Sequence, residues 1–235
     1  MKKLTNLNYS LAIIIARKNS KRIKNKNIKE FYGKPIIYYS IEAAIKSKCF
    51  DKIIVSTDCK NISNVAKKFG AEIDFIRPKN LSTNNTKTIE VIRHAINFYK
   101  KKKINFKYTS CIYPASPFIK KINLVKGFNL VRSKKIDFVL TVQPFISSID
   151  RAIKVYKNGV VKWKFPKYKN KNSNILKDYY YDAGQFYMGK TFHFFKKNLF
   201  NNKTKALKLD KFESVDINEI EDWYFAEKLF NFKKR

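Results

Sequence analysis

Residues 11–27 read LAIIIARKNSKRIKNKN, and the order of elements that begins here decides the fold. The run from 11 to 16 is apolar almost throughout, which is typical of a strand buried on both faces of a parallel sheet. A polar, basic loop then extends to about Lys34. Pro35 stands where a helix can begin, and apolar or small residues follow it at helical spacing: Ile36, Ile37, Ser40, Ile41, Ala44 and Ile45. A buried strand, a loop and an amphipathic helix in this order indicate an α/β protein.

The same rhythm continues as far as residue 142. We expect further strands at 53–56, 73–76, 110–113 and 138–142, and helices between them at 62–69, 88–99 and 122–131. Strands that alternate with helices form a mostly parallel sheet with helices on both faces. The prediction is therefore a Rossmann-like sheet in a single domain, with its ligands beyond the carboxyl ends of the strands.

The segment from 145 to 181 breaks this rhythm. Two short β-like runs, at 152–156 and 160–163, flank Lys157-Asn158-Gly159, which is a hairpin signal. A loop rich in lysine and asparagine follows, and the chain returns to a strand at 185–188 and a last helix at about 220–230. We interpret 145–181 as an insertion that leaves the sheet, and we predict that it serves as a dimerisation arm.

The composition limits the class of protein. The chain has 235 residues, of which 44% are hydrophobic, so one large domain with a packed core is expected. No apolar run approaches the roughly 20 residues of a membrane-spanning helix, and the N-terminus lacks the features of a signal peptide. Three cysteines stand far apart without C-x-x-C spacing, and only two histidines are present, which disfavours zinc sites and Ser-His-Asp triads. A cytoplasmic enzyme that does not associate with membranes is the simplest interpretation.

The charge is strongly positive, because 51 Lys and Arg residues against 18 Asp and Glu residues give +33. Such a balance raises the alternative of a basic nucleic-acid-binding protein, which predicts one contiguous basic face and binding that weakens steeply with salt. The lysines are scattered along the chain, however, mostly beside Asn and Ile, which share AT-rich codons with Lys. Nucleic-acid binding is therefore the less favoured interpretation. A basic cleft still raises the local concentration of a nucleoside triphosphate.

The basic loop after the first strand has the groups that nucleotidyl transfer requires. Transfer from a triphosphate shifts negative charge onto the leaving pyrophosphate, so cationic side chains and hydrogen-bond donors must surround the phosphates. Arg17, Ser20, Lys21 and Lys26 supply both kinds of group. The glycine-rich fingerprints of dinucleotide-binding enzymes and P-loop ATPases are absent, which excludes those two classes. On composition alone, a solvated basic surface is the commoner explanation of such a loop.

The pattern R-x-N-S-K-x-I-x-x-K-N, from Arg17 to Asn27, is similar to the signature of the CMP-sialic acid synthetases and their relatives, the acylneuraminate cytidylyltransferase family. The resemblance implies a nucleotidyltransferase fold, CTP as one substrate, an acidic nine-carbon sugar as the other, and a homodimer. Many relatives have two glycines where this chain has Lys18 and Asn19, and Asn tolerates the left-handed backbone that glycine allows. The catalytic residues that the resemblance implies, which stabilise charge on the phosphates, are Arg17, Lys21 and Lys26.

Two further loops belong to the same resemblance. R-P-K-N-L-S at 77–82 resembles the family's R-P-x-x-L-[AS] loop, which closes over the cytosine. S-T-D at 56–58 follows a strand, and its carboxylate, Asp58, either lies at the ligand edge of the sheet or caps the next helix. The nucleotide-binding residues that the resemblance implies are Ala16, Arg17, Ser20, Lys26, Asn27, Arg77, Pro78 and Ser82.

Two segments, Y-P-A-S-P-F at 113–118 and D-A-G-Q-F-Y at 182–187, stand where the family binds its sugar. Sialic acid members have Gln in place of Tyr113, and the second segment is similar to that of members that act on pseudaminic acid. We therefore expect pseudaminic acid as the acceptor, with N-acetylneuraminic or legionaminic acid as alternatives. Arg151, in the insertion, is a candidate for the carboxylate of the sugar. The substrate-binding residues expected on this basis are Tyr113, Ser116, Arg151, Asp182, Gln185 and Tyr187.

S-V-D-I-N-E at 214–219 is the candidate metal site. Alternate residues of a strand face the same side, so Asp216 and Asn218 are predicted to share one Mg²⁺ ion. Relatives usually have a second Asp at the position of Asn218, and the alternative role of this residue is to cap the last helix. The implied reaction is a direct displacement, in which the anomeric hydroxyl of the sugar attacks the α-phosphorus of CTP and pyrophosphate leaves.

Overall fold

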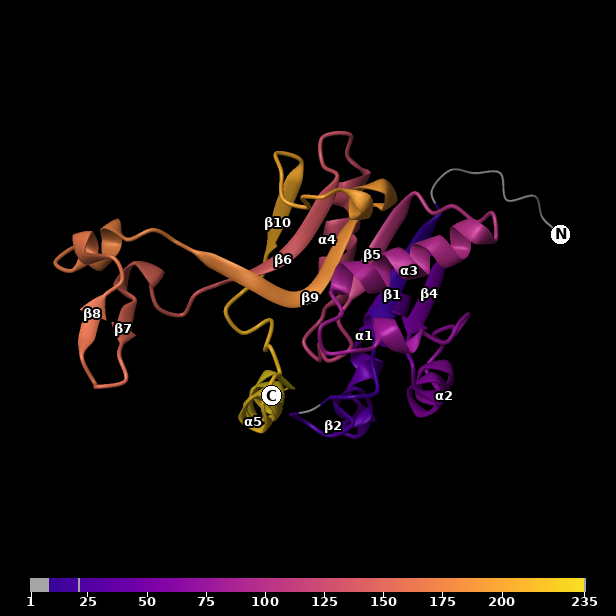
Figure 1. Cartoon of the computed structure of the whole chain (residues 1–235), viewed down its shortest axis with the longest axis horizontal. Coiled ribbons are helices and arrows are strands. Elements are labelled where there is room, and N and C mark those ends of the chain that lie inside the picture. Colours follow the sequence, from indigo (N-terminus) through magenta and orange to yellow (C-terminus); the bar gives the residue numbers. More distant parts are fainter. Residues whose placement is uncertain (1–8, 21, 235) are drawn as a thin grey trace.

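The computed structural model describes residues 9–20 and 22–234, and its centre is a six-stranded sheet in the order β10-β6-β9-β5-β1-β4 (Figure 1). The strands are β1 (Ser10–Ile15), β4 (Lys52–Ser56), β5 (Tyr108–Ile112), β6 (Phe138–Pro144), β9 (Tyr180–Lys190) and β10 (Thr204–Lys208). β9 runs antiparallel to both of its neighbours, and the other pairings are parallel. The expected mostly parallel sheet is confirmed.

Helices cover both faces of this sheet. They are α1 (Ile37–Ser47), α2 (Lys60–Lys68), α3 (Thr88–Lys101) and α4 (Lys121–Arg132), whereas α5 (Ile220–Lys234) packs on the loop after β1. The alternation along β1 sorts its side chains, because Ala12 and Ile14 pack with residues of α1, α2 and α4, whereas Leu11 and Ile13 pack with residues of α3. No described helix has the length and hydropathy needed to cross a bilayer.

A third apolar cluster attaches α5 to the loop after β1. In this cluster Phe31, from the small ladder of β2 (Glu30–Phe31) and β3 (Lys34–Pro35), meets the ring of Trp223 edge-on, with ring centroids 5.5 Å apart. Lys29 places its ammonium 5.1 Å from the centroid of the same Trp223 ring. This packing brings the segment before α5 next to the basic loop.

The insertion forms the arm, residues 145–179, which extends away from the sheet between β6 and β9 (Figure 1). The expected hairpin is confirmed, with β7 (Ile153–Val155) antiparallel to β8 (Val161–Trp163). Short 3-10 helices complete the chain, at Lys26–Ile28, Lys79–Leu81, Ile149–Arg151, Pro166–Tyr168, Ser173–Ile175 and Thr191–Phe195.

The expectation of a strand at 73–76 is wrong. This part of the chain makes only one isolated bridge, between Glu72 and Ile54, and then leaves the sheet. Asp74 accepts a hydrogen bond of 2.7 Å from the Tyr99 hydroxyl and lies 3.1 Å from the Lys52 ammonium. The segment therefore finds its partners in side chains rather than in a continued ladder, an outcome that a short apolar run does not exclude.

Candidate functional site

A pocket of about 480 Å³ opens beyond the carboxyl ends of β1 and β5. Its walls come from four stretches far apart in sequence, at 15–27, 77–91, 113–115 and 215–218, together with Gly184. This is the edge of a parallel sheet at which ligands are expected, and the volume is in the range of small-molecule sites.

One wall is cationic and comes from the basic loop. Arg17 donates to the backbone oxygen of Thr83 at 2.8 Å, and Lys26 donates to the backbone oxygen of Ile217 at 2.6 Å. Asn27 is buried and holds the loop by donating to the backbone oxygen of Arg17 at 2.9 Å. Both cations keep further N–H groups for a ligand, since a lysine has three and an arginine five. The anchoring bonds thus hold the two cations in place before any ligand arrives.

Burial perturbs one of these cations. Desolvation lowers the pKa of Lys26, and the charge of Asp216 opposes that shift. Ser20 lines the same wall. Ala16 lies beneath the wall, where its N–H donates to the backbone oxygen of Ser56 at 3.0 Å. The predicted catalytic Lys21 lies outside the described residues.

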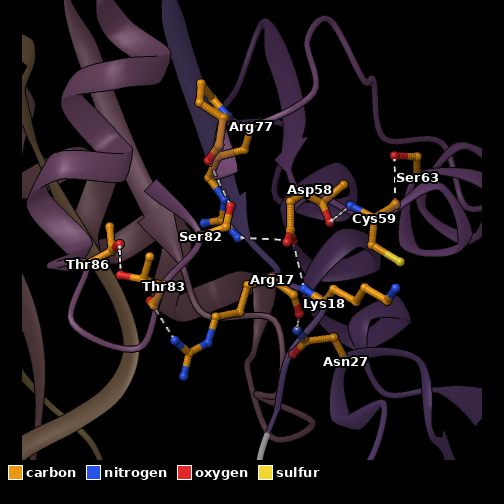
Figure 2. A network of polar contacts seen from close by, with 12 residues as sticks. Arg17, Lys18, Asn27, Asp58, Cys59, Ser63, Arg77, Ser82, Thr83 and Thr86 are labelled. Carbon is orange, nitrogen blue, oxygen red and sulfur yellow. Dashed lines mark hydrogen bonds and ion pairs between the residues drawn. The ribbon is translucent and has the colours of Figure 1, made fainter. Parts of the chain in front are cut away.

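Arg77 lines another part of the pocket, from the segment after α2. Its side chain is 4% exposed, and its backbone N–H donates to the Thr57 oxygen at 2.8 Å. Within the described part of the chain, Nε and Nη2 of its guanidinium have no hydrogen-bond partner, although Nη2 lies 3.9 Å from the Asp58 carboxylate (Figure 2). Buried donors without partners are unusual in proteins. Both atoms are covered by surrounding protein atoms, although Arg77 as a residue lines the pocket.

The loop after Arg77 lines the pocket through residues other than the predicted ones. Leu81, Thr83 and Asn84 reach the pocket, whereas Pro78 and Ser82 lie outside its lining. Ser82 instead donates to the backbone oxygen of Pro78 at 3.1 Å and so closes the local turn. The family pattern R-P-x-x-L-[AS] marks the turn correctly, but the residues that face the pocket come mostly after the turn.

The candidate metal residues lie at the other side of the cationic wall. Asn218 donates to Asp216 Oδ2 at 2.6 Å, and Arg22 donates to Asn218 Oδ1 at 2.7 Å and to Glu219 at 2.9 Å. The expectation that these residues lie on a strand is wrong, because 214–218 has no strand pairing. The Asp222 carboxylate accepts from the backbone N–H groups of Asn218 and Glu219, each at 2.8 Å, and thus caps α5.

Three of the expected sugar-binding residues, Tyr113, Tyr187 and Asp182, lie next to one another. Tyr113 lines the pocket, and burial raises its pKa to about 12. Its ring meets that of Tyr187 edge-on with centroids 5.7 Å apart, and the Tyr187 hydroxyl donates to Asp182. Tyr187 and Asp182 therefore lie behind Tyr113 and act on the pocket through it.

The other expected sugar-binding residues do not line the pocket of their own chain. Gln185 is 1% exposed and donates to the backbone oxygen of Glu213. Ser116 is buried and donates to the Gly184 oxygen at 3.4 Å. Arg151 is on the arm, where it donates to the Lys171 oxygen at 3.0 Å. In a single chain these three side chains support the backbone rather than face a substrate.

Comparison with known proteins gives the family. A sequence profile described as "Cytidylyltransferase" matches residues 11–217. The chain belongs to the cytidylyltransferase family. A cytidylyltransferase is a nucleotidyltransferase, so the enzyme class expected from the sequence is confirmed.

Similar curated cytidylyltransferases include one from Campylobacter jejuni, named pseudaminic acid cytidylyltransferase, which is 33% identical over 94% of this chain and 96% of its own length. The "Pseudaminic acid cytidylyltransferase and UDP-2,4-diacetamido-2,4,6-trideoxy-beta-L-altropyranose hydrolase" of Helicobacter pylori is 36% identical over 88% of this chain, which spans 40% of that longer protein. The N-acylneuraminate cytidylyltransferase of Escherichia coli is 29% identical over 92% of this chain and 51% of its own length.

Solved structures agree with the fold. A CMP:2-keto-3-deoxy-manno-octonic acid synthetase complexed with CTP superimposes with a TM-score of 0.68 at 12% identity, over 96% of this chain and 99% of that chain. A 4-diphosphocytidyl-2C-methyl-D-erythritol synthase from Anaerococcus prevotii gives a TM-score of 0.62 at 14% identity, over 95% of this chain and 99% of that chain. At these identities the likeness concerns the fold alone, which is the predicted nucleotidyltransferase fold.

The sequence pattern did not single out Arg22, Thr83 and Asn84, which also line the pocket. Arg22 stands in a loop where most residues are basic or Asn, so nothing in its type separates it from its neighbours. Arg22 differs from its neighbours because it hydrogen-bonds to Asn218 and Glu219, which lie near the other end of the chain. Such a long-range contact has no local signal in the sequence.

Proposed function

We propose that this cytidylyltransferase transfers the CMP group of CTP to an acidic nine-carbon sugar, pseudaminic acid, and releases pyrophosphate. The observation that carries the proposal is the presence, in one pocket, of a cationic wall with Arg17 and Lys26 and of a second part that Arg77 lines. A triphosphate matches the first and the acceptor atoms of a pyrimidine match the second. The curated relatives that share most of the chain carry the same activity in their names.

In this proposal the chain acts by positioning and by charge. Arg17 and Lys26 neutralise the charge that grows on the phosphates as pyrophosphate leaves, while their bonds to Thr83 and Ile217 keep them in place. Asn27 keeps the loop closed beneath them. The anomeric hydroxyl of the sugar then displaces pyrophosphate at the α-phosphorus in a single step, and no covalent bond to the enzyme forms.

The segment 216–218 offers the type of oxygen ligand that a magnesium ion prefers. Mg²⁺ in nucleotide sites is held by one or two carboxylates together with substrate phosphates and waters, and Asp216 supplies one carboxylate. The amide of Asn218 turns its nitrogen toward Asp216 and its oxygen toward Arg22, so Asp216 would hold the ion without it. Among the described residues, no group of three or more His, Cys, Asp or Glu side chains is arranged to hold a metal. When bound, Mg²⁺ supplies neutralisation of charge on the phosphate oxygens.

Pseudaminic acid is favoured as the acceptor by the residues around Tyr113. An aromatic ring at this wall, supported by Tyr187 and Asp182, offers an apolar surface with one hydroxyl. The alternatives are N-acetylneuraminic acid and legionaminic acid, because curated relatives include enzymes named for N-acylneuraminate and for N,N'-diacetyllegionaminic acid.

The same proposal includes a homodimer formed through the arm. The register of the hairpin places Ile153, Val155, Val161 and Trp163 on one face of the ribbon, and the first three are 51%, 63% and 54% exposed. A two-stranded hairpin is marginally stable alone, so an exposed apolar face of this kind favours a second surface that covers it. A second copy would also give Arg151 a way to reach a pocket, which its own chain does not provide.

The test is the release of pyrophosphate from CTP with Mg²⁺, with pseudaminic, legionaminic and N-acetylneuraminic acids as acceptors. We expect release with pseudaminic acid at a rate well above that with the other two. Release with only one of the other acids would keep the reaction and reject the acceptor. The absence of release with all three, from folded protein that binds CTP, would contradict the proposed transfer to these sugars.

A further inference from the structure

We propose that Asp58 is a positioning residue that joins the two halves of the nucleotide pocket and thereby gives the enzyme its selectivity for CTP over a bare polyphosphate. The inference rests on the proposed function, because it assigns the cationic wall to phosphates and the Arg77 end to the base. Asp58 itself is not part of the pocket lining. Its effect must therefore act through the groups that it contacts.

A single oxygen of Asp58 faces both halves. Oδ1 accepts a hydrogen bond of 2.8 Å from the backbone N–H of Lys18, in the basic loop, and the same Oδ1 lies 3.9 Å from Nη2 of Arg77 (Figure 2). The loop after β1 and the segment that begins with Arg77 are separated by the whole of α1, β4 and α2 in sequence. Asp58 is thus a direct link between the two ends of the pocket.

The structure rejects the other role that the sequence allowed for Asp58. The N-cap of α2 is Cys59, and no side chain caps this helix. The Cys59 N–H bonds instead to the Thr57 hydroxyl at 3.2 Å. Oδ1 of Asp58 instead contacts Lys18 and Arg77.

The carboxylate matters to Arg77 because this guanidinium is almost completely buried. Burial lowers the pKa of Arg77, and the charge of Asp58 works against that effect. Asp58 forms the ion pair of Arg77 within the described residues. A buried cation that loses its partner is strongly disfavoured and moves toward water. We infer that the carboxylate holds the guanidinium at the pocket wall, which Arg77 lines.

Two substitutions separate the two contacts. Asp58→Asn keeps an oxygen that can accept the Lys18 N–H but removes the charge that faces Arg77. Asp58→Ala removes both. Asp51→Asn is a matched control, because Asp51 precedes β4 and accepts the backbone N–H of Ser10 at 2.8 Å, at the opposite end of the same strand pair. CTP and inorganic tripolyphosphate are titrated into each protein by calorimetry.

We expect Asp58→Asn to weaken the affinity for CTP at least about tenfold and to leave that for tripolyphosphate within about twofold. Asp58→Ala should weaken both ligands at least about tenfold, and Asp51→Asn neither. If Asp58→Asn leaves CTP binding unchanged, or weakens both ligands equally, the proposal is overturned.

A wild-type protein that binds CTP no more tightly than tripolyphosphate would instead reject the proposed function, and the inference with it. If Asp58→Asn does not fold, the double variant Asp58→Asn with Arg77→Gln removes both buried charges together, which relieves the unpaired cation. It should bind CTP weakly and tripolyphosphate normally. Wild-type affinity for CTP in this double variant would overturn the role of the pair.

Discussion

The pocket and the arm are held together in different ways. The bonds that shape the pocket join residues far apart in the chain, with 66 residues between Arg17 and Thr83 and 191 between Lys26 and Ile217. The bonds of the arm are local, since Arg151 reaches Lys171, only 20 residues away. The pocket is thus a product of the whole fold, whereas the arm depends on local contacts and leaves an apolar face exposed. Changes in the first should affect nucleotide binding, and changes in the second should affect assembly.

The largest effect on kcat/KM for CTP is expected from the substitution of Lys26, the half-buried cation of the pocket. Lys26→Ala should lower kcat/KM for CTP by about a hundredfold to a thousandfold, because it removes a fixed charge from the site where negative charge develops. Lys157→Ala, at the tip of the arm, removes the same type of charge from an exposed turn outside the pocket and should change kcat/KM less than about twofold. Equal losses in the two variants would mean that the overall charge of +33, rather than the pocket, attracts the nucleotide.

The pH dependence of kcat/KM should report the charge of Lys26 in the pocket. Burial lowers the pKa of Lys26, so this cation is charged below its lowered pKa and loses its charge as the pH rises through that value, earlier than an exposed lysine would. We expect kcat/KM for CTP to fall on the alkaline side for this reason, since kcat/KM reports the free enzyme. Lys26→Arg should move the fall to higher pH, because a guanidinium stays charged there. An alkaline limb that stays at the same pH in Lys26→Arg would assign it to another group.

The smallest effect on the affinity for CTP is expected from substitutions in the arm. Val155→Asp with Val161→Asp places two charges on the apolar face of the hairpin, so a dimer that buries this face should dissociate. Light scattering after gel filtration should give twice the chain mass for the wild type and the chain mass for the variant. The affinity for CTP should stay within about twofold. A monomeric wild type would contradict the proposed dimer, and a loss of CTP binding in the variant would show that the arm and the pocket are not independent.

Much of the fold follows from the sequence, because its strands and helices have strong periodic patterns. The run 11–16 and the alternation at 53–142 predict β1, β4, β5, β6 and the helices between them correctly, whereas the strand expected at 73–76 does not form. β10 is not revealed by its pattern, since T-K-A-L-K is short and lies at an exposed sheet edge. The antiparallel direction of β9 also has no local signal, because residue type does not encode the direction of a neighbour.

The site is predictable where it depends on local sequence and not where it depends on tertiary contacts. Arg17, Ser20 and Lys26 line the pocket as the family pattern implies. Gln185 has the polarity of a binding residue, but its carboxamide is used beneath the pocket for the Glu213 backbone. Asp58 has two possible roles in the sequence, and only the position of Arg77 in space shows which groups its carboxylate serves.

A crystal structure of the wild-type enzyme with CTP tests the central claim most directly. We predict that the triphosphate lies against Arg17, Ser20 and Lys26, and that the cytosine lies at the part of the pocket that Arg77 lines. A nucleotide bound in the opposite direction, or outside the pocket between 15–27 and 215–218, would contradict the account.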